Sequence, residues 1–499
     1  MKRRLLAGLL ALVLCIGAAL PVYGEEALTP EVQAQVLREV ARFVQENCLT
    51  SSPEDDPLGR VFPQWQQEGA LVAALERDAA LYDRLLREML SAYDSHTMYI
   101  PAGAYSLSFP MTGTNYVGVG VTLAAQEEQI IVADVSLQGS AFAAGVLAGD
   151  VLTAINGNSL HGTPAIGVSA QLRGEAGTTV KVTLTRAGQP YTVTLLRQAL
   201  TDPIYQGRPL NEHIFYMKWN QFSTEEDSLQ HFRNDLATLT AEDFLILDLR
   251  DNPGGDLDLA CTVASDLLPE RCTFFSFTQR RASKTQPDEK YFNSDGNGKA
   301  LKHIYILTNE NTASAAEVLT ASLRDTGYAT VIGTTTHGKA RAQSHVLLPE
   351  DAAAVVTVMG LLSIRDGDYE GVGLAPDIAL TSAAVAGSCA FVPDTVALAL
   401  YSCSDNGIAL HQALVSLGLL DNLPEKPYQV GPETLAALER LRCVYGLEQT
   451  AAGADIPVLR LVNLLLSRQK LGSYLRDDPL LAALNLCQQT LSPTLTPAA

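Results

Sequence analysis

The segment Thr308–Gln343 of this 499-residue chain reads TNENTASAAEVLTASLRDTGYATVIGTTTHGKARAQ. An apolar strand predicted over 303–307 ends just before it, a turn of small residues follows, and a helix is predicted over 315–325. A turn at Thr326-Gly327 and a strand over 329–332 then bring the chain back. This order of strand, helix and strand predicts an α/β arrangement around the segment.

Ser314 stands where the predicted turn meets the predicted helix, which is a favourable place for a nucleophile. The first N–H groups of a helix have no partner within the helix, so they are able to stabilise an oxyanion. The site therefore offers both a group that attacks and groups that stabilise the charge created by the attack.

Lys339 is a candidate general base that the spacing brings within reach of Ser314. About eleven helical residues advance the chain by about 16 Å, and roughly five strand residues return it by a similar distance. A loop over 333–338 then brings Lys339 beside Ser314. A lysine base must be neutral, so we expect an apolar setting for its amine, with Gln343 placed to hold it. A Ser/His/Asp triad through His337 is the alternative.

This segment resembles the C-terminal processing peptidases, also called tail-specific proteases (peptidase family S41). Their nucleophilic Ser opens a small-residue motif, and their Lys lies in a GK motif that is followed by a Gln. The resemblance makes Ser314 the nucleophile, Lys339 the base and Gln343 the residue that orients the lysine. It also places an acid at Asp325, which we interpret as structural.

A second match to the same family lies at 248–255, where DLRDNPGG is similar to the signature DLRxNPGG. Consecutive glycines allow the backbone to approach a ligand closely. The resemblance implies that an N–H of Gly254 or Gly255, with Gly254 favoured, joins the N–H of Ala315 in an oxyanion hole.

The β-rich stretch 116–198 resembles a PDZ domain, and SAFAAGVLAGDVL at 140–152 matches the pattern SPAAxAGLxxGDxL except at Phe142. In such domains a strand edge and a loop capture the end of a peptide. The resemblance also implies that the Arg of the LRG motif, Arg173, links this module to the protease core and gates it. An exposed cation at a helix end is the alternative for Arg173. The residues implied in peptide binding are Tyr116, Val117, Gly118, Val119 and Gly120.

The resemblance covers roughly residues 30–380 and implies a multidomain α/β (α+β) fold with a ClpP/crotonase-like protease core. Residues 409–470 weakly resemble a peptidoglycan-binding helical module, and a plain helical appendage is the alternative. The predicted parts are a signal peptide or uncleaved anchor (1–24), an N-terminal helical region (25–104), a PDZ-like domain (105–198), the S41-type core (199–385), a linker (386–408), the helical module (409–470) and a C-terminal tail (471–499).

The first 24 residues combine a basic start with an apolar run and small residues before Glu25, which predicts export with cleavage after Gly24 or retention as an anchor. The net charge of −20 disfavours nucleic-acid binding. The eight cysteines form no CxxC pair and no metal-binding spacing, so we expect no zinc site. No phosphate-binding or dinucleotide motif is present, so we expect no cofactor.

The sequence thus predicts an exported serine endopeptidase that cleaves proteins near accessible C-termini. The alternative is a catalytically silent scaffold that binds peptides and the cell wall. The resemblance also implies a homodimer formed through the terminal helices. The alternative is that the apolar faces of these helices pack on the core of the same chain.

Overall fold

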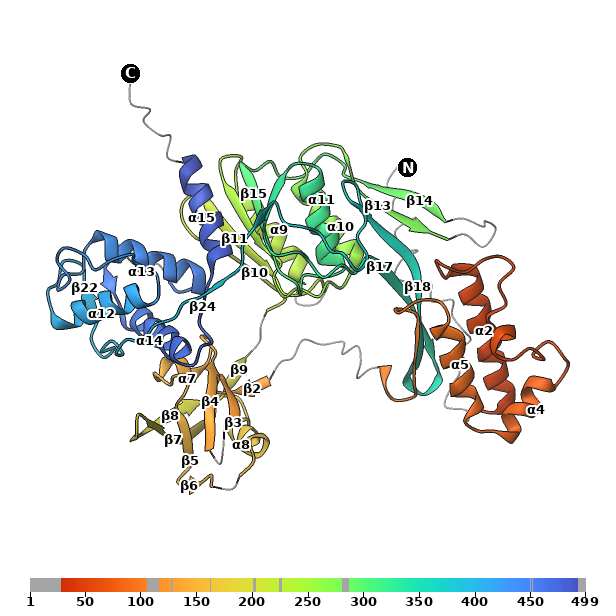
Figure 1. Cartoon of the computed structure of the whole chain (residues 1–499), viewed down its shortest axis with the longest axis horizontal. Helices are drawn as coiled ribbons and strands as arrows, with labels where there is room; N and C mark the ends of the chain where they lie inside the picture. The colour runs from red at the N-terminus through yellow and green to blue at the C-terminus, as the bar shows by residue number, and fades with distance from the viewer. Residues whose placement is uncertain are drawn as a thin grey trace, which may run out of the picture. The chain divides into compact units, whose positions relative to one another are not determined.

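The computed structural model describes residues 28–105, 116–126, 129–161, 163–200, 203–223, 227–280, 287–448, 450 and 452–491. The chain forms two compact units, each assembled from two separate stretches of sequence (Figure 1). Unit 1 comprises residues 1–112 and 204–379, and unit 2 comprises 113–203 and 380–499. The predicted signal peptide or anchor at 1–24 lies outside the described residues. Among the described residues, no helix combines the length and apolar character needed to cross a membrane.

Unit 1 contains a six-stranded sheet in which all neighbours pair in parallel except the first two. All five residues of its central strand β12 are buried, as expected for a parallel strand covered on both faces. The strands, in order across the sheet, are β10 (Tyr205–Pro209), β11 (Ile214–Trp219), β12 (Phe244–Asp248), β15 (His303–Thr308), β16 (Ala329–Gly333) and β20 (Ile378–Ala379).

Three helices accompany this sheet: α9 (Ser228–Thr238), α10 (Leu257–Leu267) and α11 (Ala315–Asp325). The predicted strands and helices of this region are confirmed to within one residue at each end. Because β12 and β15 are parallel neighbours, the loops that follow them leave the same edge of the sheet. The two motifs singled out in the sequence therefore lie side by side.

A second, antiparallel sheet of unit 1 is centred on the long strand β18. The N-terminal helices pack their apolar faces against β17 and β18, forming one buried cluster with them. The elements of the sheet are β1 (Met98–Ile100), β13 (Thr273–Gln279), β14 (Asp288–Asn293), β17 (Arg341–Leu348), η2 (Pro349–Asp351), β18 (Ala352–Ser363) and β19 (Gly367–Asp368), and the helices are α2 (Pro30–Asn47), α3 (Pro57–Val61), α4 (Ala70–Arg77) and α5 (Leu81–Ser91).

Unit 2 contains the β-rich module that the sequence predicts, and two helices, α7 and α8, interrupt its strands. Strand β3 forms one edge of its sheet, and α8 packs against that strand. The elements are β2 (Tyr116–Gly118), β3 (Val121–Gln126), β4 (Gln129–Val135), α7 (Ser140–Ala143), β5 (Val151–Ile155), β6 (Asn158–Ser159), α8 (Ala165–Leu172), β7 (Thr179–Arg186), β8 (Gln189–Leu196) and β9 (Gln198–Leu200).

The C-terminal helices share one hydrophobic core with this β-rich module. Arg468 on α14 also donates to Asp134 of β4 at 2.8 Å. Helix α12 begins ahead of residue 409, and α15 lies within the predicted tail. The elements are β21 (Ala383–Ala384), β22 (Leu398–Ala399), α12 (Asp405–Ser416), α13 (Pro432–Tyr445), β23 (Gly453–Ala454), α14 (Ile456–Lys470), β24 (Leu475–Arg476) and α15 (Asp478–Leu491).

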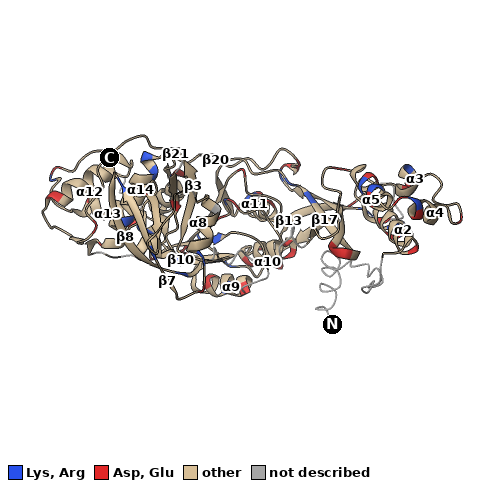
Figure 2. Ribbon diagram, turned by 90° about the horizontal axis from the view of Figure 1, so that it is seen from below, with Lys and Arg blue, Asp and Glu red and all other residues tan. Residues whose placement is uncertain are grey.

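Charged residues of both signs are interspersed on the N-terminal helices α4 and α5 (Figure 2). The cysteines of the described part of the chain are all free; Cys48, Cys261 and Cys487 are buried, whereas Cys403 is exposed. No group of three or more His, Cys, Asp or Glu side chains suited to a metal ion occurs among those residues. The mixed helix-and-sheet architecture confirms the predicted multidomain α/β fold class.

Candidate active site

Ser314 lies between the end of β15 and the start of α11, in a backbone conformation with φ 56° and ψ −120°. A positive φ at a residue with a Cβ is strained, and such strain is frequent at functional sites. The hydrogen bonds around Ser314 hold it in place. Its N–H donates to Glu317 Oε2 at 2.8 Å, and its carbonyl accepts the N–H of Glu317 at 2.9 Å.

The carboxylate of Glu317 connects the nucleophile segment with the lysine segment. Oε2 accepts the N–H of Ser314 and the N–H of Lys339, each at 2.8 Å. Oε1 accepts the N–H of Gly338 at 2.7 Å and the hydroxyl of Thr336 at 2.5 Å. Glu317 is fully buried, and its four partners are all donors, so the site requires an acceptor at both oxygens.

Sequence reasoning did not single out Glu317. A signal for it is present, because Ser314-Ala-Ala-Glu317 has the S-x-x-E spacing in which the acid returns to the N–H of the residue that caps the helix. That spacing predicts the bond to Ser314. It does not predict the bonds to residues 336–339, which depend on how the later loop folds back.

Lys339 follows β16 at the end of the loop 334–338 and is partly buried. Its pKa is lowered from the usual value, chiefly by burial, while the negative charges of Glu370 and Glu317 oppose that shift. Desolvation disfavours the charged form of an amine. A partly buried amine with a lowered pKa is what a lysine that accepts a proton requires.

The loop 249–255 is fastened to the segment in front of Ser314 by both side chains and backbone. The Thr312 hydroxyl donates to the Leu249 carbonyl at 2.8 Å, and the Ala313 N–H donates to the Asn252 carbonyl at 2.9 Å. The Asn309 amide donates to Asp251 Oδ1 at 2.8 Å. These bonds fix the two motifs against each other.

Gly254 lies directly against Ser314. A Cβ placed on Gly254 would be 2.7 Å from the Ser314 Cβ and 2.9 Å from the Ala315 nitrogen, and its φ is 98°. Only glycine fits this space and this backbone conformation. The predicted oxyanion residues Ala315 and Gly254 are thus neighbours of the nucleophile.

The two glycines differ in what their N–H groups do. The Gly254 N–H already donates to Asn252 Oδ1 at 2.8 Å, so it is engaged within the loop. Gly255 follows with φ 130°. The Phe222 N–H donates to the Gly254 carbonyl, and the Asp256 N–H donates to the Phe222 carbonyl. Gly255 lies between Gly254 and Asp256 and forms an isolated parallel β-bridge with Phe222. The preference for Gly254 as oxyanion donor therefore gains no support from this hydrogen-bond pattern.

Gln343 and His337 were the other side chains considered for proton transfer. The Gln343 amide nitrogen donates to the Arg341 carbonyl at 2.9 Å, at a β-bulge in β17. This bond is local to its strand and is not a bond to the lysine amine. His337 is exposed, and its N–H donates to the Thr312 carbonyl at 2.9 Å. Among the described residues, no acid bonds to the His337 imidazole to orient it, as a triad requires.

The residues implied in peptide binding belong to unit 2. The backbone of Tyr116, Val117 and Gly118 pairs with β9, so this strand is already occupied on that side. Gly120 has φ 83°, and a Cβ there would be 2.6 Å from the Gly139 Cα. Val119 is buried and begins the turn that leads into β3. Strand β3, one edge of the sheet, begins at Val121, directly after the predicted peptide-binding stretch.

Arg173 caps the C-terminal end of α8 in an extended conformation and is exposed. It belongs to unit 2, whereas Ser314 and Lys339 belong to unit 1. Its role as a link between the two remains a prediction.

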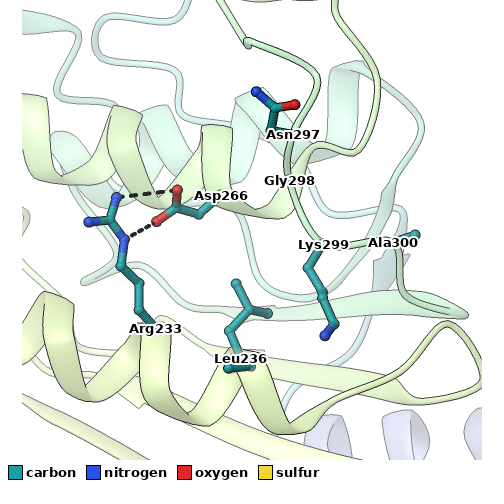
Figure 3. A pocket seen from close by; sticks show the side chains of 8 residues that line it. Arg233, Leu236, Asp266, Asn297, Gly298, Lys299 and Ala300 are labelled. Carbon is teal, nitrogen blue, oxygen red and sulfur yellow. Dashed lines mark hydrogen bonds and ion pairs between the residues drawn. The ribbon is translucent and has the colours of Figure 1, made fainter.

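A surface cavity of about 310 Å³ lies elsewhere in unit 1, between α9, the end of α10 and residues 297–300 (Figure 3). The Arg233 guanidinium and the Asp266 carboxylate, which both line it, form an ion pair with each other at 2.6 Å. None of the residues predicted for catalysis lines this cavity.

Comparisons with known proteins find two matching families in this chain. Residues 213–380 match Peptidase family S41, and residues 117–196 match the PDZ domain family. The chain is 29% identical over 354 residues to the carboxy-terminal-processing protease of Bartonella bacilliformis, covering 69% of this chain and 80% of that one. It is 30% identical over 242 residues to the carboxyl-terminal-processing protease of Synechocystis sp., covering 47% and 55% of the two chains.

Among solved structures, the photosystem II D1 C-terminal processing protease matches with 23% identity and a TM-score of 0.42, covering 70% of this chain and 93% of that one.

Proposed function

Because this chain belongs to peptidase family S41 and carries a PDZ domain ahead of its peptidase region, we propose that it is a serine endopeptidase that cleaves protein substrates near their C-termini. The observation that carries the proposal is the shared Glu317 carboxylate, which ties the backbone of Ser314 to that of Lys339. This contact brings the expected nucleophile and the expected base to one place.

In the proposed mechanism the Ser314 hydroxyl attacks the scissile carbonyl and gives its proton to the neutral Lys339 amine. The oxygen of the tetrahedral intermediate takes hydrogen bonds from the Ala315 N–H and from a glycine N–H of the 254–255 pair. The protonated lysine returns its proton to the leaving amine, which frees the first product. The lysine then activates water, and hydrolysis of the ester releases the second product and restores Ser314.

The role of the PDZ domain is part of the proposal. A peptide with a free C-terminus would add as a strand along β3, since this is the edge of the sheet and α8 packs beside it. Arg173 would couple the peptide-bound domain to the peptidase region. Replacing Arg173 with Ala should then reduce cleavage of tailed substrates; unchanged cleavage would remove this part of the proposal.

The central test is an endopeptidase assay with an unstructured protein that ends in small apolar residues. The wild-type chain should release defined fragments, whereas Ser314→Ala and Lys339→Met should not. His337→Ala should remain active, since the proposal gives His337 no part in proton transfer. Binding without cleavage by the wild-type chain would favour the catalytically silent scaffold instead.

Location and assembly belong to the same proposal. The basic and apolar segment at 1–24 supports export to the cell envelope, and fractionation of cells with antibodies to the chain tests it. Attachment to peptidoglycan through the C-terminal helices is tested by co-sedimentation of the full chain with purified cell wall, with the chain alone as control for self-pelleting. Sedimentation velocity distinguishes a homodimer from a monomer.

A further inference from the structure

Glu370 lies just after β19, with its carboxylate between two groups that are distant in sequence. Oε2 accepts the N–H of Ala340 at 2.6 Å, and Oε1 lies 2.7 Å from Nε2 of His96. Ala340 directly follows Lys339, so the backbone that carries the lysine is held by this carboxylate. The side chains of His96 and Glu370 are each 27% exposed, so the pair sits at the border of the site.

His96 is itself held firmly. Asp94 Oδ1 accepts the N–H groups of His96 and Thr97, each at 2.8 Å, which closes a tight turn. The same carboxylate oxygen accepts the Thr357 hydroxyl at 2.9 Å, and the Thr97 hydroxyl accepts the Thr357 N–H at 3.1 Å. The turn is thereby fixed to β18. His96 meets Glu370 from a rigid position, not from a mobile loop.

The charges around the lysine amine come from several elements. Glu370 is the strongest of the charged groups that act on Lys339, and Glu317 on α11 is the second. His345 on β17 also lies near Lys339. Its pKa is lowered, first by burial and second by the positive charge of Lys339. Besides His96 and Lys339, the titratable groups near Glu370 include Arg341, the buried Tyr369 and Asp368, whose Oδ1 accepts the Glu370 N–H at 3.1 Å.

We propose that Glu370, held between the Ala340 N–H and the His96 imidazole, is a positioning residue that controls both the placement and the charge of the Lys339 amine. The inference rests on the Ser314–Lys339 mechanism proposed above and extends it by two residues. Burial drives Lys339 toward the neutral form, and the Glu370 carboxylate resists this. The balance of the two sets the pH at which the lysine becomes a base.

The test compares the wild-type chain with Glu370→Gln, His96→Ala, His96→Gln and the control Glu310→Gln. Glu310 is an exposed acid four residues before Ser314 and is not among the charges that act on Lys339. Two readouts are followed over a pH series. One is kcat/KM for a tailed peptide, and the other is the acetylation rate of the Lys339 amine by acetic anhydride, quantified by mass spectrometry.

Glu370→Gln should move the midpoint of Lys339 acetylation, and the acidic limb of kcat/KM, to lower pH by about one unit, because an opposing negative charge is removed. His96→Ala should produce a smaller shift in the opposite direction, to higher pH, since loss of the imidazole donor leaves more of the Glu370 charge to act on Lys339. His96→Gln keeps a donor for Glu370 Oε1 and should restore the wild-type midpoint. Glu310→Gln should leave both readouts unchanged.

An unchanged acetylation midpoint in Glu370→Gln, or an equal shift in Glu310→Gln, would overturn the inference. Loss of kcat in Glu370→Gln with no shift of either midpoint would assign Glu370 a structural role only, which also overturns it. The acetylation readout needs no proteolysis. If the wild-type chain cleaves no substrate, the proposed function fails while the coupling between Glu370 and Lys339 is still decided.

Discussion

Ser314 and Lys339, which are separated by a helix, a strand and a loop, donate their backbone N–H groups to the same oxygen atom, Glu317 Oε2, each at 2.8 Å. The shared acceptor fixes the distance between the two segments through main-chain atoms. The side chains of both residues stay available for chemistry, because neither takes part in this anchoring.

Replacing Glu317 with Gln should destabilise unit 1 and abolish peptidase activity. In either orientation of the new amide, its NH2 group replaces an oxygen that accepts two hydrogen bonds, so two donors lose their acceptor. The negative charge of the Glu317 carboxylate, which these donors stabilise, is lost as well. Such a change costs about 3 kcal/mol of unfolding free energy. Urea unfolding and kcat/KM measure the two effects. Glu310→Gln is the matched control and should stay within about 0.5 kcal/mol of wild type.

Replacing Gly254 with Ala should reduce kcat/KM by about 100-fold or more, because the new Cβ would displace Ser314 or the Ala315 nitrogen from their positions. Gly367→Ala separates this effect from backbone strain. Gly367 also has a positive φ, 74°, but a Cβ there meets nothing within 4 Å. It should lower stability by about 1 kcal/mol and leave kcat/KM unchanged. Equal activity losses in the two variants would contradict the close-contact explanation.

Replacing Lys339 with Met should abolish cleavage and yet stabilise the fold at neutral pH. Since the pKa of Lys339 is lower in the folded chain than in the unfolded one, the unfolded chain binds more protons between these two pKa values, and stability rises with pH there. The advantage of the Met variant should therefore shrink as pH rises toward the ordinary lysine pKa. Thermal unfolding at several pH values measures it, and a pH-independent difference would argue against a shifted lysine.

Replacing Asp325 with Asn should destabilise unit 1 without a specific effect on catalysis. Asp325 pairs with Arg324 at 2.8 Å, and both side chains are almost completely buried. It also accepts the Ser363 hydroxyl at 2.6 Å. Asp366 remains as a second partner for Arg324, so we expect a loss of about 2 kcal/mol. Urea unfolding reports the loss, and a change in the pH profile of kcat/KM would contradict a purely structural role.

The elements around Ser314 could be predicted from sequence because their signals are local. Helix α11 begins and ends where the capping residues and the apolar period place it. The contact of Gly254 with Ser314 follows from two adjacent parallel strands, which the motifs already indicate. For these parts, short-range patterns and sheet topology carry the information.

The contacts of longer range could not be predicted. The His96–Glu370 pair joins residues 274 positions apart, and no local pattern links the two. The bond from Gln343 to the Arg341 carbonyl depends on a β-bulge, which no local signal marks. The C-terminal helices were expected as a separate module, but burial of their apolar faces joins them to the core of the β-rich module.

Strand β1 pairs with β18, so the N-terminal region completes its packing only after residues far along the chain have been made. The Asp94 carboxylate accepts the hydroxyl of Thr357, 263 positions later, and the apolar faces of α2 and α5 pack on β17 and β18 as well as on the neighbouring helices. While the ribosome makes the intervening residues, these helices have no strand to pack on. Contacts of such large separation form slowly and leave apolar surface open to aggregation. A nascent chain that stops before residue 341 should consequently bind chaperones through its first helices.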